Sequence, residues 1–168
     1  MLCLLGLQFT APATPPPAMV EEQARTVMEK FTAAMKAKDA DGVSRLLSKD
    51  CIVIMLDSVA VSGRARFFTR DSYLELLKQR YSETTATNSN RVIRDISTSK
   101  TGDVFVTIDA ETRARTETRS EWFRSHEYIV MRPVSGNLLI VMVVAQMVFY
   151  VPDVPPGPTA EPKSNRSQ

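Results

Sequence analysis

The sequence has few of the residues from which metal, redox and cofactor sites are built. It contains two cysteines, one histidine and one tryptophan in 168 residues. The cysteines form no CxxC pair and no cluster with the histidine, so neither a zinc site nor a redox pair is indicated. The glycine-rich motifs that hold dinucleotides or phosphates, GxGxxG and the P-loop, are also missing. We therefore expect no cofactor and no metal.

A strong excess of either charge is missing too. Lysine and arginine together number 21, and aspartate and glutamate 19, which gives a net charge of +2. This balance gives no reason to expect nucleic acid or an anionic membrane as a partner. The apolar run at residues 138–150 has 13 residues, fewer than the roughly 18 that a membrane helix requires. With 43% hydrophobic residues, the chain can build a domain with a substantial core and no integral membrane span.

The two ends of the chain differ in composition from its middle. Residues 1–19 combine an apolar stretch, MLCLLGLQF, with a Pro-rich linker, and residues 152–168 form a Pro-rich polar tail that we expect to be disordered. The apolar stretch is typical of the end of an export signal, although a positively charged start is missing. We therefore predict one domain over residues 20–151 of an exported, periplasmic or secreted protein. A cytoplasmic location and a tether to an envelope complex are the alternatives.

Hydrophobic periodicity predicts three helices. Apolar residues recur at helical spacing from residue 20 onward, which predicts a long helix that ends near Lys38. An Asp-Gly turn at residues 41–42 precedes a short helix over residues 43–47. A third helix is predicted over residues 71–81.

Alternating and β-branched segments predict five strands. The segments with a strand pattern are residues 51–57, 91–97, 104–115 and the two arms of a long hairpin over residues 117–150 that turns at residues 135–137. Residues 58–69 and 82–90 are predicted to be loops. The nearly continuous apolar run of the last strand predicts cover on both of its faces. Helices first and antiparallel strands later predict an α+β fold, with helices against one face of a curved antiparallel sheet.

This order of elements, together with the segment AAMKAKDADGVSRLLSKDCIVIML at residues 33–56, resembles the nuclear transport factor 2-like (NTF2-like) superfamily. Within it, the chain is most similar to SnoaL-like and ketosteroid-isomerase-like proteins over about residues 20–150. The resemblance implies a cone in which a bent sheet wraps around the long helix, with two shorter helices, and encloses an apolar pocket. Members of the superfamily include isomerases, cyclases, dehydratases and non-catalytic binding or dimerisation modules. The resemblance therefore implies a fold and leaves the activity open.

The resemblance also singles out residues that could act in catalysis. Isomerase-like members carry a general-base aspartate on the first strand, where this sequence has Met55, and Asp57 lies one strand repeat further on with the same parity. They also carry a tyrosine on the first helix, where Phe31 is the only aromatic residue here. Cyclase-like members use a His and Asp pair as acid and base. His126, the single histidine, and Asp57 are therefore the candidate pair.

Each candidate residue could also have a purely structural role. His126 shares a strand face with Trp122 and Tyr128, and a histidine that is hydrogen-bonded on a partly exposed sheet is common. Asp57, at the end of a strand, could cap or turn a loop. Arginines and glutamates that alternate over residues 111–124 predict cross-strand ion pairs. The candidate pocket residues, which would line a cavity or fill a core, are Phe31, Met55, Phe67, Phe68, Tyr73, Trp122 and Tyr128.

Two functional hypotheses follow. The first is a SnoaL-like domain without catalytic activity that binds a small apolar molecule in its cone pocket, or forms a homodimer through its sheet. It rests on the apolar strand at residues 138–150 and on the incomplete catalytic set. The second is an enzyme of the isomerase, cyclase or dehydratase type that uses His126 and Asp57 around an apolar substrate.

Overall fold

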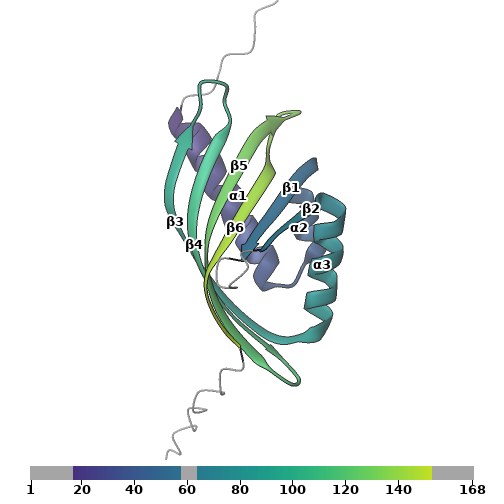
Figure 1. Ribbon diagram of the computed structural model, residues 1–168. Helices are drawn as coiled ribbons and strands as arrows, with labels where there is room; N and C mark the ends of the chain where they lie inside the picture. Colours follow the sequence, from purple (N-terminus) through teal and green to yellow (C-terminus); the bar gives the residue numbers. More distant parts are fainter. Residues whose placement is uncertain (1–16, 58–63, 153–168) are drawn as a thin grey trace, which may run out of the picture.

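The computed structural model describes residues 17–57 and 64–152 of the chain. Within these residues, three helices lie against one face of a six-stranded curved sheet (Figure 1). Most of the signal-like segment and linker, and nearly all of the Pro-rich tail, lie outside the described residues. The helices are α1 (Pro17–Lys36), α2 (Ala40–Leu46) and α3 (Arg70–Glu83). The strands are β1 (Leu47–Asp57), β2 (Arg64–Thr69), β3 (Thr84–Thr98), β4 (Val104–Thr116), β5 (Ser120–Val134) and β6 (Asn137–Pro152).

The sheet confirms the predicted α+β class, with one correction to its topology. Its strand order is β2-β1-β6-β5-β4-β3. All neighbouring pairs are antiparallel except β1 and β6, which run parallel with Val53 opposite Val143. The sheet is therefore mixed, because the last strand returns to the middle and pairs with the first one. No local pattern signals a pairing between strands so far apart in the sequence.

Two segments predicted to be loops are strands in the structure. Residues 64–69 form β2, an edge strand, and residues 84–90 form the first half of β3 at the opposite edge. Both are rich in Arg, Thr, Ser or Asn and lack a continuous apolar face. Such a polar composition is common in edge strands, which pair with a neighbour on one side only. Their partners on β1 and β4, such as Thr112 opposite Ser89, hold them in the sheet.

The helix ends also differ from the prediction in detail. Helix α1 begins at Pro17, in the predicted linker, because proline is tolerated in the first turn of a helix. Helix α2 begins directly after Asp39, whose carboxylate accepts a hydrogen bond from the Gly42 backbone N–H at 2.7 Å. Gly42 is thus inside the helix rather than in a turn. A Cβ at this position would lie 2.3 Å from Asp39 Oδ2, so the cap requires glycine here.

The core lies between the concave face of the sheet and the helices. Helix α1 crosses behind β3, β4 and β5, and α3 faces the end of the sheet where the strands bend (Figure 1). The largest fully buried side chains are Phe31, Ile108, Ile129, Met131 and Ile140. Because strand residues alternate between faces, every second residue of β4 and β5 points into this core. The bend of the sheet determines where the core ends and an open space begins.

Candidate functional site

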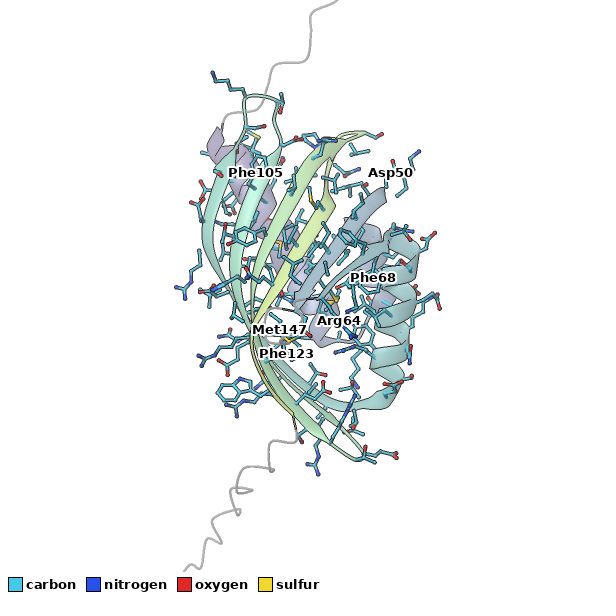
Figure 2. All side chains as sticks on the ribbon, in the orientation of Figure 1. Asp50, Arg64, Phe68, Phe105, Phe123 and Met147 are labelled. Atoms are coloured by element: carbon cyan, nitrogen blue, oxygen red, sulfur yellow. The ribbon has the colours of Figure 1, made fainter. Side chains whose placement is uncertain are left out.

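A cavity of about 190 Å³ lies between the bent part of the sheet and helices α1 and α3. The side chains of Phe123 and Met147, which both line it, lie near the bend (Figure 2). Most of its wall is apolar, since methionine, leucine and phenylalanine side chains come from both helices and from the central strands. The apolar residues that line it are Phe31, Met35, Val53, Met55, Leu56, Leu76, Leu77, Ala114, Phe123, Val143, Ala145 and Met147.

The polar side of the cavity is built around a buried ion pair between Arg91 on β3 and Glu127 on β5. Arg91 donates from Nε to Glu127 Oε2 at 3.2 Å and from Nη2 to Oε1 at 3.0 Å. The two side chains are only 10% and 7% exposed. Strand β4 runs between the two strands, and the small residue Ala110 is opposite Arg91 there. A small side chain at this point leaves room for the guanidinium group to reach across the strand.

Neighbouring groups hold this ion pair in place. Ser125 Oγ donates to Glu127 Oε1 at 3.4 Å, and the Arg91 guanidinium lies 5.5 Å from the centre of the Phe31 ring on α1. Burial lowers the pKa of Arg91, but the charge of Glu127 and its hydrogen bonds outweigh this and raise the pKa above its ordinary value. Arg91 therefore stays charged beside the Glu127 carboxylate, whose opposite charge balances it. Glu127 is held by three hydrogen bonds, which makes it a fixed wall group rather than a mobile base.

Two tyrosines from α3 also line the cavity. Tyr81 donates its hydroxyl to Met35 Sδ at 3.1 Å, and burial raises the pKa of Tyr81 to about 12. Tyr73 is 5% exposed, and burial raises its pKa still further above the ordinary value. Both phenols are therefore protonated at neutral pH. At the mouth, Asp57, Arg66 and Arg80 supply the charged groups, and both arginines are exposed.

The structure brings some of the predicted pocket residues together and separates others. Phe31, Met55 and Tyr73 line the cavity. Phe68 packs against the core without lining the cavity. The other three, Phe67, Trp122 and Tyr128, lie on the outer face, where Phe67 is 71% and Tyr128 48% exposed. The outward position of these three follows from strand parity, because their neighbours in sequence point inward.

His126 and Asp57 lie on opposite faces of the sheet. Asp57 is at the cavity, whereas His126 points outward between Ser125 and Glu127, which point inward. His126 Nδ1 lies 2.6 Å from Asp109 Oδ1, and Arg94 Nε donates to the other oxygen of Asp109 at 2.6 Å. The hydrogen bond from Arg94, and then that from His126, hold the pKa of Asp109 below its ordinary value. The arrangement is that of a hydrogen-bonded histidine on a solvated sheet surface.

The alternating charges of β4 and β5 form ion pairs on the same outer face, one of them across the strands as expected. Arg124 on β5 pairs with Glu111 on β4 at 3.4 Å, and Arg113, on the same strand as Glu111, pairs with it at 3.8 Å. Their guanidinium groups lie 5.1 and 5.3 Å from the Trp122 ring, and Trp122 Nε1 donates to Glu111 at 3.1 Å. This cluster stabilises the outer surface and does not reach the cavity.

The sequence reasoning missed the central pair of the site. Glu127 stands between Ser125 and the apolar Ile129 on the inward face of β5, and a buried position for a carboxylate is itself a signal that a cation lies nearby. Arg91, however, lies 36 positions away on another strand, in a segment whose first half was predicted to be a loop. The partner could not be identified before the register of β3, β4 and β5 was known.

Other kinds of site find little support. Among residues 17–57 and 64–152, no group of three or more His, Cys, Asp and Glu side chains is placed to hold a metal ion. In the same part of the chain, no helix is both long and apolar enough to cross a membrane. Cys51 is a free, buried thiol, and burial raises its pKa to about 11, against the opposing effect of Arg70. It is therefore a thiol rather than a nucleophilic thiolate at neutral pH.

Comparison with known proteins identifies similar folds but no similar sequence. No protein-family model matches the chain, and no curated protein matches it. An NTF2-like protein of unknown function from Shewanella baltica aligns with a TM-score of 0.62 at 12% identity, over 80% of this chain and 98% of the other. A ketosteroid isomerase-like protein from Erwinia carotovora atroseptica aligns with a TM-score of 0.61 at 13% identity, over 77% and 98%.

A hexachlorocyclohexane dehydrochlorinase has a similar structure as well. It aligns with a TM-score of 0.61 at 10% identity, over 83% of this chain and 99% of its own. An enzyme, an isomerase-like protein and a protein of unknown function thus share this architecture. At such low identity the similarity establishes the fold and does not decide between catalysis and binding.

We expect the loss of one member of the buried ion pair to destabilise the fold strongly. Arg91→Met leaves the Glu127 carboxylate buried without its partner, and should lower the free energy of unfolding by about 3–5 kcal/mol in urea titrations. The double variant Arg91→Met/Glu127→Leu removes both charges and should be much less destabilised. Arg25→Met, which breaks an exposed helix pair with Glu21, is the control and should cost less than about 1 kcal/mol. Equal losses for Arg91→Met and the control would contradict the proposed importance of the pair.

Proposed function

We propose that this chain, which has the NTF2-like fold, holds a small and mainly apolar molecule in the cavity of its cone. The observation that carries the proposal is the cavity itself, whose wall combines a broad apolar surface with a few converging polar groups. This combination is typical of small-molecule sites, where apolar surface supplies affinity and a few polar groups fix orientation. The cavity is about 190 Å³, below the range of about 300–1,000 Å³ for drug-sized ligands, so we propose a small occupant.

The walls of the cavity also favour a defined binding space. On the sheet side, Arg91, Glu127 and Ser125 hold one another through hydrogen bonds, so the polar wall keeps its shape without a ligand. Elsewhere in the wall, Met35 on α1 and Met55 on β1 provide a flexible apolar surface that can adapt to a ligand. A rigid polar part of the wall and an adaptable apolar part together suit a ligand with more hydrocarbon than polar surface.

We favour binding over catalysis for this cavity. General acid–base catalysis needs a group whose proton can move at the substrate. Both oxygens of Glu127 accept hydrogen bonds from Arg91, both tyrosines are firmly protonated, and His126 lies on the other face. The alternative, an isomerase-, cyclase- or dehydratase-type enzyme that uses His126 and Asp57, would need both groups to reach one substrate. That geometry is not present.

Filling the cavity should weaken ligand binding strongly. We expect small apolar probes such as indole to shift the methyl signals of Met35, Met55 and Met147 in NMR titrations, with saturation. Met55→Trp places a large side chain into the cavity and should weaken indole binding at least about tenfold. Ile52→Trp is the matched control, because Ile52 lies on the same strand, is 50% exposed and faces outward. An absence of saturable shifts in the wild-type protein, or equal binding by both variants, would contradict the proposal.

We also propose that two chains associate through the outer face of the sheet. Strand pairing places two rows of mostly apolar side chains side by side on this face, and several of them are exposed. The first row runs across four strands through Phe67, Ile54, Val144 and Tyr128, and the second through Ile52, Met142, Val130 and Phe105. Contiguous exposed apolar surface of this kind commonly marks an interface, and a symmetric dimer would bury the same patch of both chains.

A charge placed in the first row should separate the two chains. Light scattering coupled to size exclusion should give the wild-type protein twice the 18.7 kDa mass of the chain. Phe67→Glu, in a residue that is 71% exposed, should give a single-chain mass with an unchanged circular dichroism spectrum. Met19→Glu, at an exposed position on α1 away from the sheet face, is the control and should remain dimeric. A single-chain mass for the wild-type protein at all concentrations would contradict this proposal.

A further inference from the structure

The hydroxyl group of Tyr73 stands out among the polar groups around the cavity. Tyr73 belongs to α3, lines the cavity and is 5% exposed. Its side chain makes no hydrogen bond to any residue in the described parts of the chain, 17–57 and 64–152. The hydroxyl oxygen is also not sealed off by protein atoms. A tyrosine that is almost wholly buried thus presents an unused donor to an internal space.

The other deeply buried polar side chains of the cavity all have partners. Ser125 donates to Glu127, Glu127 accepts from Arg91, and Ser89 shares a hydrogen bond with Thr112 at 3.1 Å. Tyr81, the second tyrosine of α3 in the wall, donates to Met35 Sδ. Buried polar groups are almost always hydrogen-bonded, because an unmet donor or acceptor loses its interaction with water and gains nothing in return. The Tyr73 hydroxyl therefore needs a partner that the described residues do not supply.

The surroundings of Tyr73 restrict what that partner can be. Burial keeps the phenol protonated, so the group available at neutral pH is an O–H donor. The charges of Arg91 and Glu127 nearby already balance each other. A ligand that brought an ionised group to this point would therefore be buried without a counter-ion, which is strongly unfavourable. The partner must therefore accept a hydrogen bond from the phenol and carry no charge. An uncharged oxygen acceptor on a hydrocarbon frame meets both conditions.

We propose that the ligand of this cavity is an uncharged carbonyl compound whose oxygen accepts a hydrogen bond from the Tyr73 hydroxyl, while its hydrocarbon part packs against the methionine and phenylalanine side chains. This inference rests on the proposed binding function and adds the chemical class of the ligand. Tyr73 then decides which molecules of suitable size are preferred, since a carbonyl compound gains a hydrogen bond that a hydrocarbon of the same shape does not.

The test uses two probes of the same shape. Acetophenone carries a carbonyl group where α-methylstyrene carries a methylene group, so the two differ chiefly in the acceptor oxygen. We expect Tyr73→Phe to weaken the binding of acetophenone about three- to tenfold in NMR titrations and to leave that of α-methylstyrene unchanged within about twofold. Tyr81→Phe, whose hydroxyl already has a protein partner, is the matched control and should leave the ratio of the two affinities unchanged.

The possible outcomes separate this inference from the function on which it rests. If both probes bind the wild-type protein and Tyr73→Phe changes their affinities equally or not at all, the carbonyl assignment is overturned and the binding function stands. If neither probe binds, the binding function fails and the assignment with it. Thermal unfolding provides a readout that needs no ligand: Tyr73→Phe removes no protein hydrogen bond and should not lower the melting temperature. A marked loss of stability would show that the hydroxyl has a partner within the protein and would overturn the inference.

Discussion

The buried pair between Arg91 and Glu127 is the interaction on which the arrangement of the site depends. It joins β3 to β5 across β4 on the concave face and lies beneath Phe31 of α1. A charge in this position is tolerated only because its partner is close and well oriented, since either group alone would be strongly destabilising. The pair thereby fixes the relative position of three strands and one helix. It also gives the cavity one wall that is polar yet has no net charge.

The two faces of the sheet have different chemistry because of this arrangement. On the concave face, strand alternation directs Ser125 and Glu127 toward the helices, and the space left at the bend becomes the cavity. On the outer face, Arg124 forms an ion pair and His126 a hydrogen bond with residues of β4 near water. Exposed ion pairs of this kind contribute little to stability. The outer face also carries the two rows of mostly apolar side chains. One strand thus serves an internal site on one side and a surface on the other.

Much of the fold could be predicted from the sequence because it follows from local rules. The periodicity of α1 and the alternation of β4 and β5 indicate which residues point inward. Phe123, Ser125 and Glu127, which alternate with the outward His126, line the cavity. Of the predicted pocket residues, Phe31 lies on the apolar stripe of α1 and Met55 was identified through the family resemblance. Tyr73, Phe67 and Tyr128 were assigned to the pocket because they are aromatic, and of these Tyr73 lines the cavity whereas Phe67 and Tyr128 point outward. Aromatic character alone does not indicate which side of a strand a residue occupies.

The remaining features depend on pairing between distant segments. The edge strand β2, the parallel pairing of β1 with β6 and the contact of Arg91 with Glu127 are set by tertiary register rather than by local sequence. The Tyr73 hydroxyl, which has no hydrogen-bond partner among residues 17–57 and 64–152, is the extreme case, because a missing hydrogen bond becomes visible only in the three-dimensional structure. The most informative features of this site are therefore the ones that local sequence patterns could not reveal.

The existence of a stable, mainly apolar cavity at the bend of the sheet is the claim that matters most. Crystals of the protein held under xenon pressure test it directly, because xenon enters apolar cavities and is easily located in electron density. We expect a xenon site in the apolar part of the cavity, beside Met55, Phe123 and Met147. A structure in which these side chains close the space and no xenon is bound there would contradict the claim.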